Sequence, residues 1–147
     1  MKINNHELPE AFVEAISKGE LKRKIGSWNL IENHDAFGNK LETELGEVFN
    51  TFERISKETE KLPIGFEESG DSKDTFEDLM GPGAIPNIHD FSNIICFAIS
   101  GDGSPFCFDY RNSKKEPSVI WWDDVYWRLV APDFNSFISL FNIKTNS

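Results

Sequence analysis

Two histidine–aspartate dipeptides are the residues of this sequence whose types could do metal chemistry. His34-Asp35 and His89-Asp90 offer the imidazole and carboxylate ligands that a metal-dependent phosphohydrolase would need. Such a site requires several ligands projecting from helices into one place, whereas both dipeptides stand in loop-like sequence. We therefore predict loop and cap roles for them. A phosphohydrolase that uses these four residues is kept as the third functional hypothesis.

One glycine-flanked aspartate and two cysteines are the other candidates for chemistry. Asp102 lies between glycines as in part of a calcium loop, but the sequence after it lacks the further oxygen ligands and the closing glutamate, so a hairpin turn is predicted. Cys107 could act as a thiol nucleophile, yet nothing in the local sequence indicates activation. Cys96 and Cys107 lie in strands that we expect to pair, and we interpret them as small, reduced core residues.

Charge and hydropathy narrow the classes of function. The sequence has 147 residues, 39% of them apolar, which is enough to form one hydrophobic core. Its net charge of −10 is unfavourable for binding nucleic acid. The longest apolar run, Ile94–Ile99, is too short to cross a bilayer, and the N-terminus lacks the apolar stretch of a secretion signal. We expect one soluble, cytoplasmic domain over residues 1–147 that binds neither nucleic acid nor membrane directly.

The hydrophobic pattern predicts an α+β fold, an antiparallel sheet with helices packed against it. Helical spacing predicts a helix that opens at Pro9 and a second helix from Glu44 to Leu62, and alternation predicts a short strand over residues 27–31. Residues 67–74 are predicted to be an acidic surface loop, and residues 76–80 a helical turn that returns to the core.

The last third of the chain is expected to supply most of the sheet. Strands are predicted at 94–99, 105–110 and 117–124, followed by a helix that opens near residues 131–134, with Pro132 and Asp133 at its start. Both faces of the first two strands are apolar, which predicts covers on both sides, with the N-terminal and middle helices as the obvious candidates.

A tight turn at Gly101-Asp102-Gly103 sets the predicted register of the first two of these strands. With a three-residue loop, Cys96 would face Phe108 and Phe97 would face Cys107. The remaining predicted pairs are Ala98 with Phe106 and Ile95 with Asp109.

Aromatic and acidic residues on these strands are the candidates for binding a partner. Trp121 and Trp122 are adjacent, so a strand must point them to opposite faces. An exposed Trp122 beside Asp123 and Asp124 would make a good interface anchor; the alternative is that both rings are packed. The candidate partner-binding residues are Asp102, Asp109, Trp122, Asp123 and Asp124, with Glu67, Glu68, Asp71 and Asp74 as a second patch.

Asp109 stands within an apolar strand and needs an explanation of its own. It is either an acid on a sheet edge or a buried carboxylate that is hydrogen-bonded to a neighbouring loop. Arg128, which follows Trp127, is a candidate for its partner.

An ordered set of short segments resembles the SUKH superfamily. These segments are Leu8-Pro9, Gly26–Trp28, Ile94–Ala98 with Gly101–Gly103, Phe106–Tyr110, Pro117–Trp122 and Val130–Ile138. The resemblance implies an α+β domain that is found widely in bacteria as immunity proteins, which neutralise toxin domains, often nucleases. Other relatives have regulatory or scaffolding roles. The resemblance implies no shared catalytic residues and no fixed binding residues.

The leading hypothesis is therefore a non-enzymatic immunity protein without metal or cofactor. It would bind a cognate bacterial toxin domain, expected to be a basic nuclease, because an acidic inhibitor can mimic phosphates and associate quickly. The alternative is an intracellular scaffold or regulatory binding module with a non-toxin partner.

Overall fold

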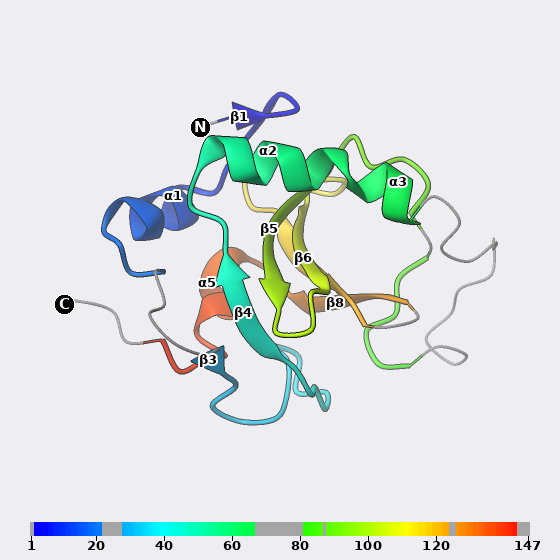
Figure 1. The fold of residues 1–147 in the computed structure, drawn as a ribbon. Helices are drawn as coiled ribbons and strands as arrows, with labels where there is room; N and C mark the ends of the chain where they lie inside the picture. The colour runs from blue at the N-terminus through cyan, green and yellow to red at the C-terminus, as the bar shows by residue number, and fades with distance from the viewer. Residues whose placement is uncertain (1, 22–27, 67–80, 87, 124–125, 144–147) are drawn as a thin grey trace.

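The protein, described by a computed structural model for residues 2–21, 28–66, 81–86, 88–123 and 126–143, is built on a curved antiparallel sheet of six strands. Their order in the sheet, β3-β4-β5-β6-β7-β8, is their order in the sequence (Figure 1). The strands are β3 (Trp28–Asn29), β4 (Glu44–Val48), β5 (Ile94–Ser100), β6 (Pro105–Asp109), β7 (Ser118–Trp122) and β8 (Trp127–Ala131). The helices are α1 (Glu10–Ser17), α2 (Phe52–Glu60), α3 (Leu62–Phe66) and α5 (Phe134–Ile138), and a small hairpin pairs β1 (Lys2–Ile3) with β2 (His6–Glu7). The predicted α+β class is confirmed.

Local sequence signals account for where the helices begin. Helix α1 follows Pro9, as predicted. Thr51 caps α2, because its side-chain oxygen accepts a hydrogen bond from the Arg54 amide at 3.2 Å. Asp133 caps α5 in the same way through the Ser136 amide at 2.7 Å, so the last helix begins at Phe134, within the predicted opening near residues 131–134.

One predicted element was wrong, and one strand was not predicted. The predicted helix from Glu44 to Leu62 is in fact strand β4 followed by α2 from Phe52, because buried residues such as Leu45 and Val48 fit a strand as well as a helix. Gly46 lies against the neighbouring strand, where an added Cβ would stand 2.7 Å from the Ser100 carbonyl oxygen. Strand β8 was missed altogether, although its apolar composition suits a buried strand.

The β5–β6 hairpin has a bulge that the predicted register lacked. Ala98 pairs with Phe106 as predicted, but the register shifts between Cys96 and Ala98. Cys96 therefore faces Cys107, not Phe108, and Ile95 faces Phe108, not Asp109. Phe97 is the extra residue.

Aromatic packing shows that the sheet is covered on two sides. On the α1 and α5 side, Phe97 stacks on Phe108 with ring centroids 4.0 Å apart. Phe12 of α1 meets both rings edge-on, at 5.6 and 5.3 Å. On the other side, the Cys96 amide donates to the Thr59 hydroxyl oxygen of α2 at 3.0 Å. The expectation of helices on both faces is confirmed.

Chain segments outside the sheet cover both of its edge strands. The segment that follows α5 pairs with β3, because the Asn142 amide donates to the Asn29 carbonyl at 2.8 Å. At the other edge, the Leu129 amide of β8 donates to the Gly83 carbonyl at 2.9 Å. The Ala36 amide, from the loop between β3 and β4, donates to the Val130 carbonyl at 3.0 Å. Covered edges remove a common route to aggregation. The loop between β3 and β4 thus connects one side of the sheet to the edge strand β8 on the other side.

Replacing Thr59 with Val should lower the free energy of unfolding by about 1–3 kcal/mol, because the shape is kept while the buried Cys96 amide loses its acceptor. Urea denaturation measures this loss. The matched control is Thr59→Ser, which retains the hydroxyl. A Thr59→Val protein as stable as the wild type would show that the hydrogen bond contributes nothing.

Candidate functional site

The sheet topology brings three of the predicted binding residues to one end of the sheet. Phe106 pairs with Trp121, so the β5–β6 turn and the end of β7 lie at the same end. We call Asp102, Trp122 and Asp123 the rim. Asp109 pairs with Ser118 at the opposite end of the same strands and is not part of the rim.

Asp102 is held in the turn between β5 and β6. The Ser100 hydroxyl donates to its carboxylate, and the Ser104 amide lies 3.4 Å from the same oxygen. The Ser100 hydrogen bond lowers the pKa of Asp102, because it favours the charged form. The residue is exposed, so the rim presents a fixed negative charge at its tip.

The two adjacent tryptophans point to opposite faces, as predicted. Trp121 is buried on the α5 side and stacks on Phe106, with ring centroids 5.6 Å apart. Trp122 is half-buried on the other side and meets Trp127 edge-on at 5.4 Å. The packed alternative therefore holds for Trp121, while part of Trp122 remains accessible at the rim.

Asp123 is fixed by a buried arginine. The Arg128 Nη1 atom donates to the Asp123 carboxylate at 3.3 Å, and its Nη2 atom donates to Asp35 at 2.9 Å and to the Lys40 carbonyl at 2.6 Å. The Arg128 and Asp35 side chains are 4% and 0% exposed, whereas the Asp123 side chain is 28% exposed. Asp123 thus has an inward contact and a solvent-accessible portion.

Asp35 also organises its own loop, which confirms the predicted loop role. One carboxylate oxygen accepts from the amides of Phe37 and Asn39, at 2.8 and 3.1 Å. His34 beside it bonds to the Asp35 carbonyl and to the Glu32 carboxylate, and these contacts raise the pKa of His34. Sequence reasoning missed the Asp35–Arg128 pair; the Asp35 to Gly38 spacing indicates only a turn.

The expected pairing of Asp109 with Arg128 was wrong. Asp109 is buried and receives two parallel hydrogen bonds from Arg111, with Nε at 2.9 Å and Nη2 at 2.8 Å. Arg111 stands two residues further along, where its short reach satisfies both carboxylate oxygens. The buried interpretation of Asp109 is therefore the correct one.

The second histidine–aspartate dipeptide also has a loop role. His89 and Asp90 are exposed, and the Asp90 carboxylate accepts from the Ser92 amide at 2.9 Å, which lowers the pKa of Asp90. Across the part of the chain that the structure describes, no group of three or more His, Cys, Asp or Glu side chains could hold a metal ion.

Five of the predicted binding residues lie outside the described residues. They are Asp124, Glu67, Glu68, Asp71 and Asp74. They remain predictions from charge and sequence.

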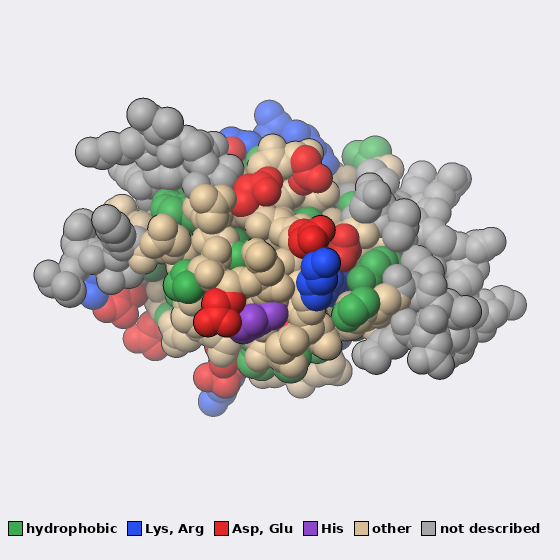
Figure 2. All heavy atoms as spheres, turned by 90° about the horizontal axis from the view of Figure 1, so that it is seen from below, with side chains coloured by type: hydrophobic (Ala, Val, Ile, Leu, Met, Phe, Trp, Pro, Cys, Tyr) green, Lys and Arg blue, Asp and Glu red, His purple; other side chains and the backbone are tan. Residues whose placement is uncertain are grey.

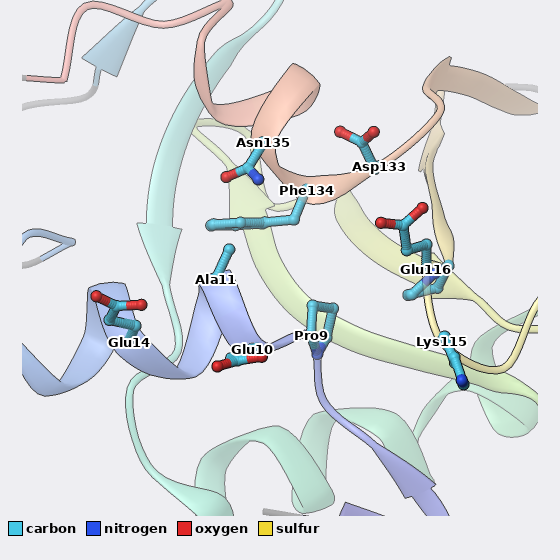
Figure 3. A pocket seen from close by; sticks show the side chains of 10 residues that line it. Pro9, Glu10, Ala11, Glu14, Lys115, Glu116, Asp133, Phe134 and Asn135 are labelled. Atoms are coloured by element: carbon cyan, nitrogen blue, oxygen red, sulfur yellow. The ribbon is translucent and has the colours of Figure 1, made fainter.

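Acidic side chains are also prominent elsewhere on the surface. Figure 2, which views the molecule from below, shows them spread across that face. A hollow of about 450 Å³ between the start of α1, the start of α5 and the β6–β7 loop is lined by Glu10, Glu14, Glu116 and Asp133, with Lys115 among them (Figure 3). Asp133 already caps α5. The acidity is therefore a property of several surfaces and is not confined to the rim.

The fold is a small α+β domain whose buried acids are bound by arginines of the same chain. A family model described as SMI1 / KNR4 family (SUKH-1) matches residues 4–140, and the chain belongs to this family. No curated protein and no solved structure matches the chain. None of the helices described is long and apolar enough to cross a membrane.

Replacing Asp35 with Ala should lower the free energy of unfolding by about 3–5 kcal/mol, because Arg128 would be left buried without its principal counter-charge. Chemical denaturation measures the loss. The control is Glu14→Ala, which removes an exposed ion pair with Lys18 and should leave stability nearly unchanged. Equal effects of the two substitutions would contradict a special role for the buried pair.

Replacing Ser100 with Ala should raise the pKa of Asp102 toward its ordinary value, because the lowering contact is lost. A pKa lowered by folding means that this contact stabilises the fold above the unfolded-state pKa. The stabilisation disappears as the pH falls through the folded-state pKa. NMR titration of the Asp102 carboxyl carbon measures the shift. Ser104→Ala, which keeps the Ser100 contact, is the control, and an unchanged Asp102 pKa in Ser100→Ala would refute the assignment.

Proposed function

We propose that this protein is an immunity protein that binds a cognate bacterial toxin domain and blocks its activity. Membership of the SUKH-1 family over residues 4–140 is the observation that carries the proposal, because this family is known for immunity proteins in toxin systems. In this role the protein acts in the cytoplasm of the cell that it protects. Its action is stoichiometric binding and involves no turnover.

The charge of the chain supports a basic toxin, with a nuclease as the proposed class. The net charge is −10, and a nuclease active site presents positive charge to the phosphates of its substrate. An acidic inhibitor is attracted to such a surface before contact and competes there with nucleic acid. High affinity is physically attainable, since nuclease–immunity pairs are among the tightest protein complexes.

The rim supports a specific binding mode. Trp122 is half-buried at the rim, and interface anchors are often Trp side chains surrounded by polar residues. Asp102 and Asp123 lie at the same end of the sheet and carry negative charge, one exposed and one partly exposed. Both acids are held by hydrogen bonds from Ser100 and Arg128, so little side-chain freedom is lost on binding. Asp124 and the acids of residues 67–74 are proposed as additional contacts.

Co-expression with the C-terminal domain encoded by the neighbouring gene tests the proposal. If that domain is a toxin, growth should arrest when it is expressed alone and recover with this protein, and the two should co-purify. Growth arrest in the presence of abundant folded protein would contradict immunity. A neighbouring domain that binds without being toxic would instead favour a scaffold or regulatory module.

Reversing the charge of Asp102 should weaken toxin binding about tenfold and flatten its dependence on salt, because a steering charge at the rim becomes repulsive. The measurement is the dissociation constant of Asp102→Lys at two ionic strengths. Glu116→Lys is the matched control, since it makes the same charge change in the exposed β6–β7 loop at the opposite end of the sheet. Equal losses for both variants would point to net charge rather than the rim.

A further inference from the structure

The two cysteines form a directly opposed pair on the central strands. Cys96 of β5 is the register partner of Cys107 of β6. The Cys96 amide donates to the Thr59 hydroxyl oxygen of α2, which fits the arrangement of a non-hydrogen-bonded pair. Facing residues of that kind have Cα atoms roughly 4.5 Å apart, which falls within the range of about 4.4–6.8 Å that a disulfide bridges.

A small cavity leads to one member of this pair. Cys96 lines a space of about 150 Å³ between the end of α2 and the β5–β6 hairpin, together with Glu58, Leu62 and Gly103. A water molecule occupies roughly 30 Å³ of liquid volume, so a molecule little larger than water fits this cavity. Cys107 does not line the cavity, and burial raises the pKa of the Cys107 thiol, which keeps it protonated.

We propose that Cys96 and Cys107 are a site of reversible oxidation at which a small peroxide forms an intramolecular disulfide. The Cys96 sulfur attacks one oxygen of hydrogen peroxide, the O–O bond breaks, and Cys96 sulfenic acid and water form. The Cys107 sulfur then attacks the Cys96 sulfur, the S–O bond breaks, and the Cys107 thiol proton passes to the departing hydroxyl, which leaves as a second water. Two thiols and one peroxide thus give one disulfide and two waters. The sulfurs lose two electrons and the peroxide gains them.

The proposed bond has a structural consequence of its own. It would close the hairpin between residues 96 and 107 into a ring across the bulge at Phe97. A cross-link restricts the unfolded chain more than the folded one, so the oxidised protein should resist unfolding better. This inference is independent of the proposed function, because both cysteines are buried in the core and neither belongs to the rim.

Peroxide treatment of the purified full chain tests the proposal. After treatment, denaturation in N-ethylmaleimide and intact-mass measurement, we expect a monomer that has lost about 2 Da and takes up no maleimide. Dithiothreitol should restore two reactive thiols, and the melting temperature should be higher before that reduction than after it.

Single cysteine variants separate this site from general thiol oxidation. In Cys107→Ser, peroxide should leave Cys96 as an oxygen adduct instead of a disulfide. In Cys96→Ser, Cys107 should remain reactive toward maleimide once denatured. The wild-type result does not depend on the folding of either variant. Two maleimides on the peroxide-treated wild type, cysteine sulfinic acid without a disulfide, or disulfide-linked dimers would each overturn the proposal.

Discussion

The buried ion pair between Asp35 and Arg128 is the interaction on which the arrangement of this fold depends. The two residues are 93 positions apart, and their contact holds the loop between β3 and β4 against β8. Burying two charges is unfavourable unless their remaining hydrogen-bonding atoms are also satisfied. Here Asp35 accepts two backbone amides of its own loop, and the Arg128 Nη2 atom also binds the Lys40 carbonyl, whereas the buried Arg128 Nε atom has no partner among the described residues. Such directional contacts fix where the loop lies, which apolar packing alone does not.

The same arginine connects the interior to the rim. The Arg128 Nη1 atom donates to Asp123, so the position of this surface acid depends on an ion pair formed inside the molecule. Asp109 at the opposite end of the sheet is held by Arg111 in a comparable way. These contacts divide the acids of the chain into those that serve the fold and those that face solvent. Asp109 therefore does not belong to the proposed binding surface, in which Asp102 and Trp122 remain.

Local sequence patterns, such as apolar spacing and turn residues, predicted much of the fold. They did not predict contacts between residues that are distant in the sequence. The glycines around Asp102 and the alternation of large apolar residues identify the β5–β6 hairpin, and Pro9 identifies the start of α1. The bulge at Phe97 escaped prediction because it depends on Thr59, which supplies an acceptor from α2. Strand β4 was mistaken for part of a helix because Leu45 and Val48 have helical spacing, and a register shift between Leu45 and Glu47 interrupts the alternation of the strand. Nothing near Arg128 in the sequence indicates Asp35 as its partner.

The central claim is that this SUKH-1 chain is an immunity protein. It is tested most directly by an inhibition assay on the C-terminal domain encoded by the neighbouring gene, provided that this domain is toxic when expressed alone. The toxin's activity on its own substrate would be measured while this protein is titrated in at constant salt. A stoichiometric inhibitor should reduce activity in proportion to the amount added and abolish it at equimolar ratio. Undiminished toxin activity in the presence of excess folded protein would contradict the account.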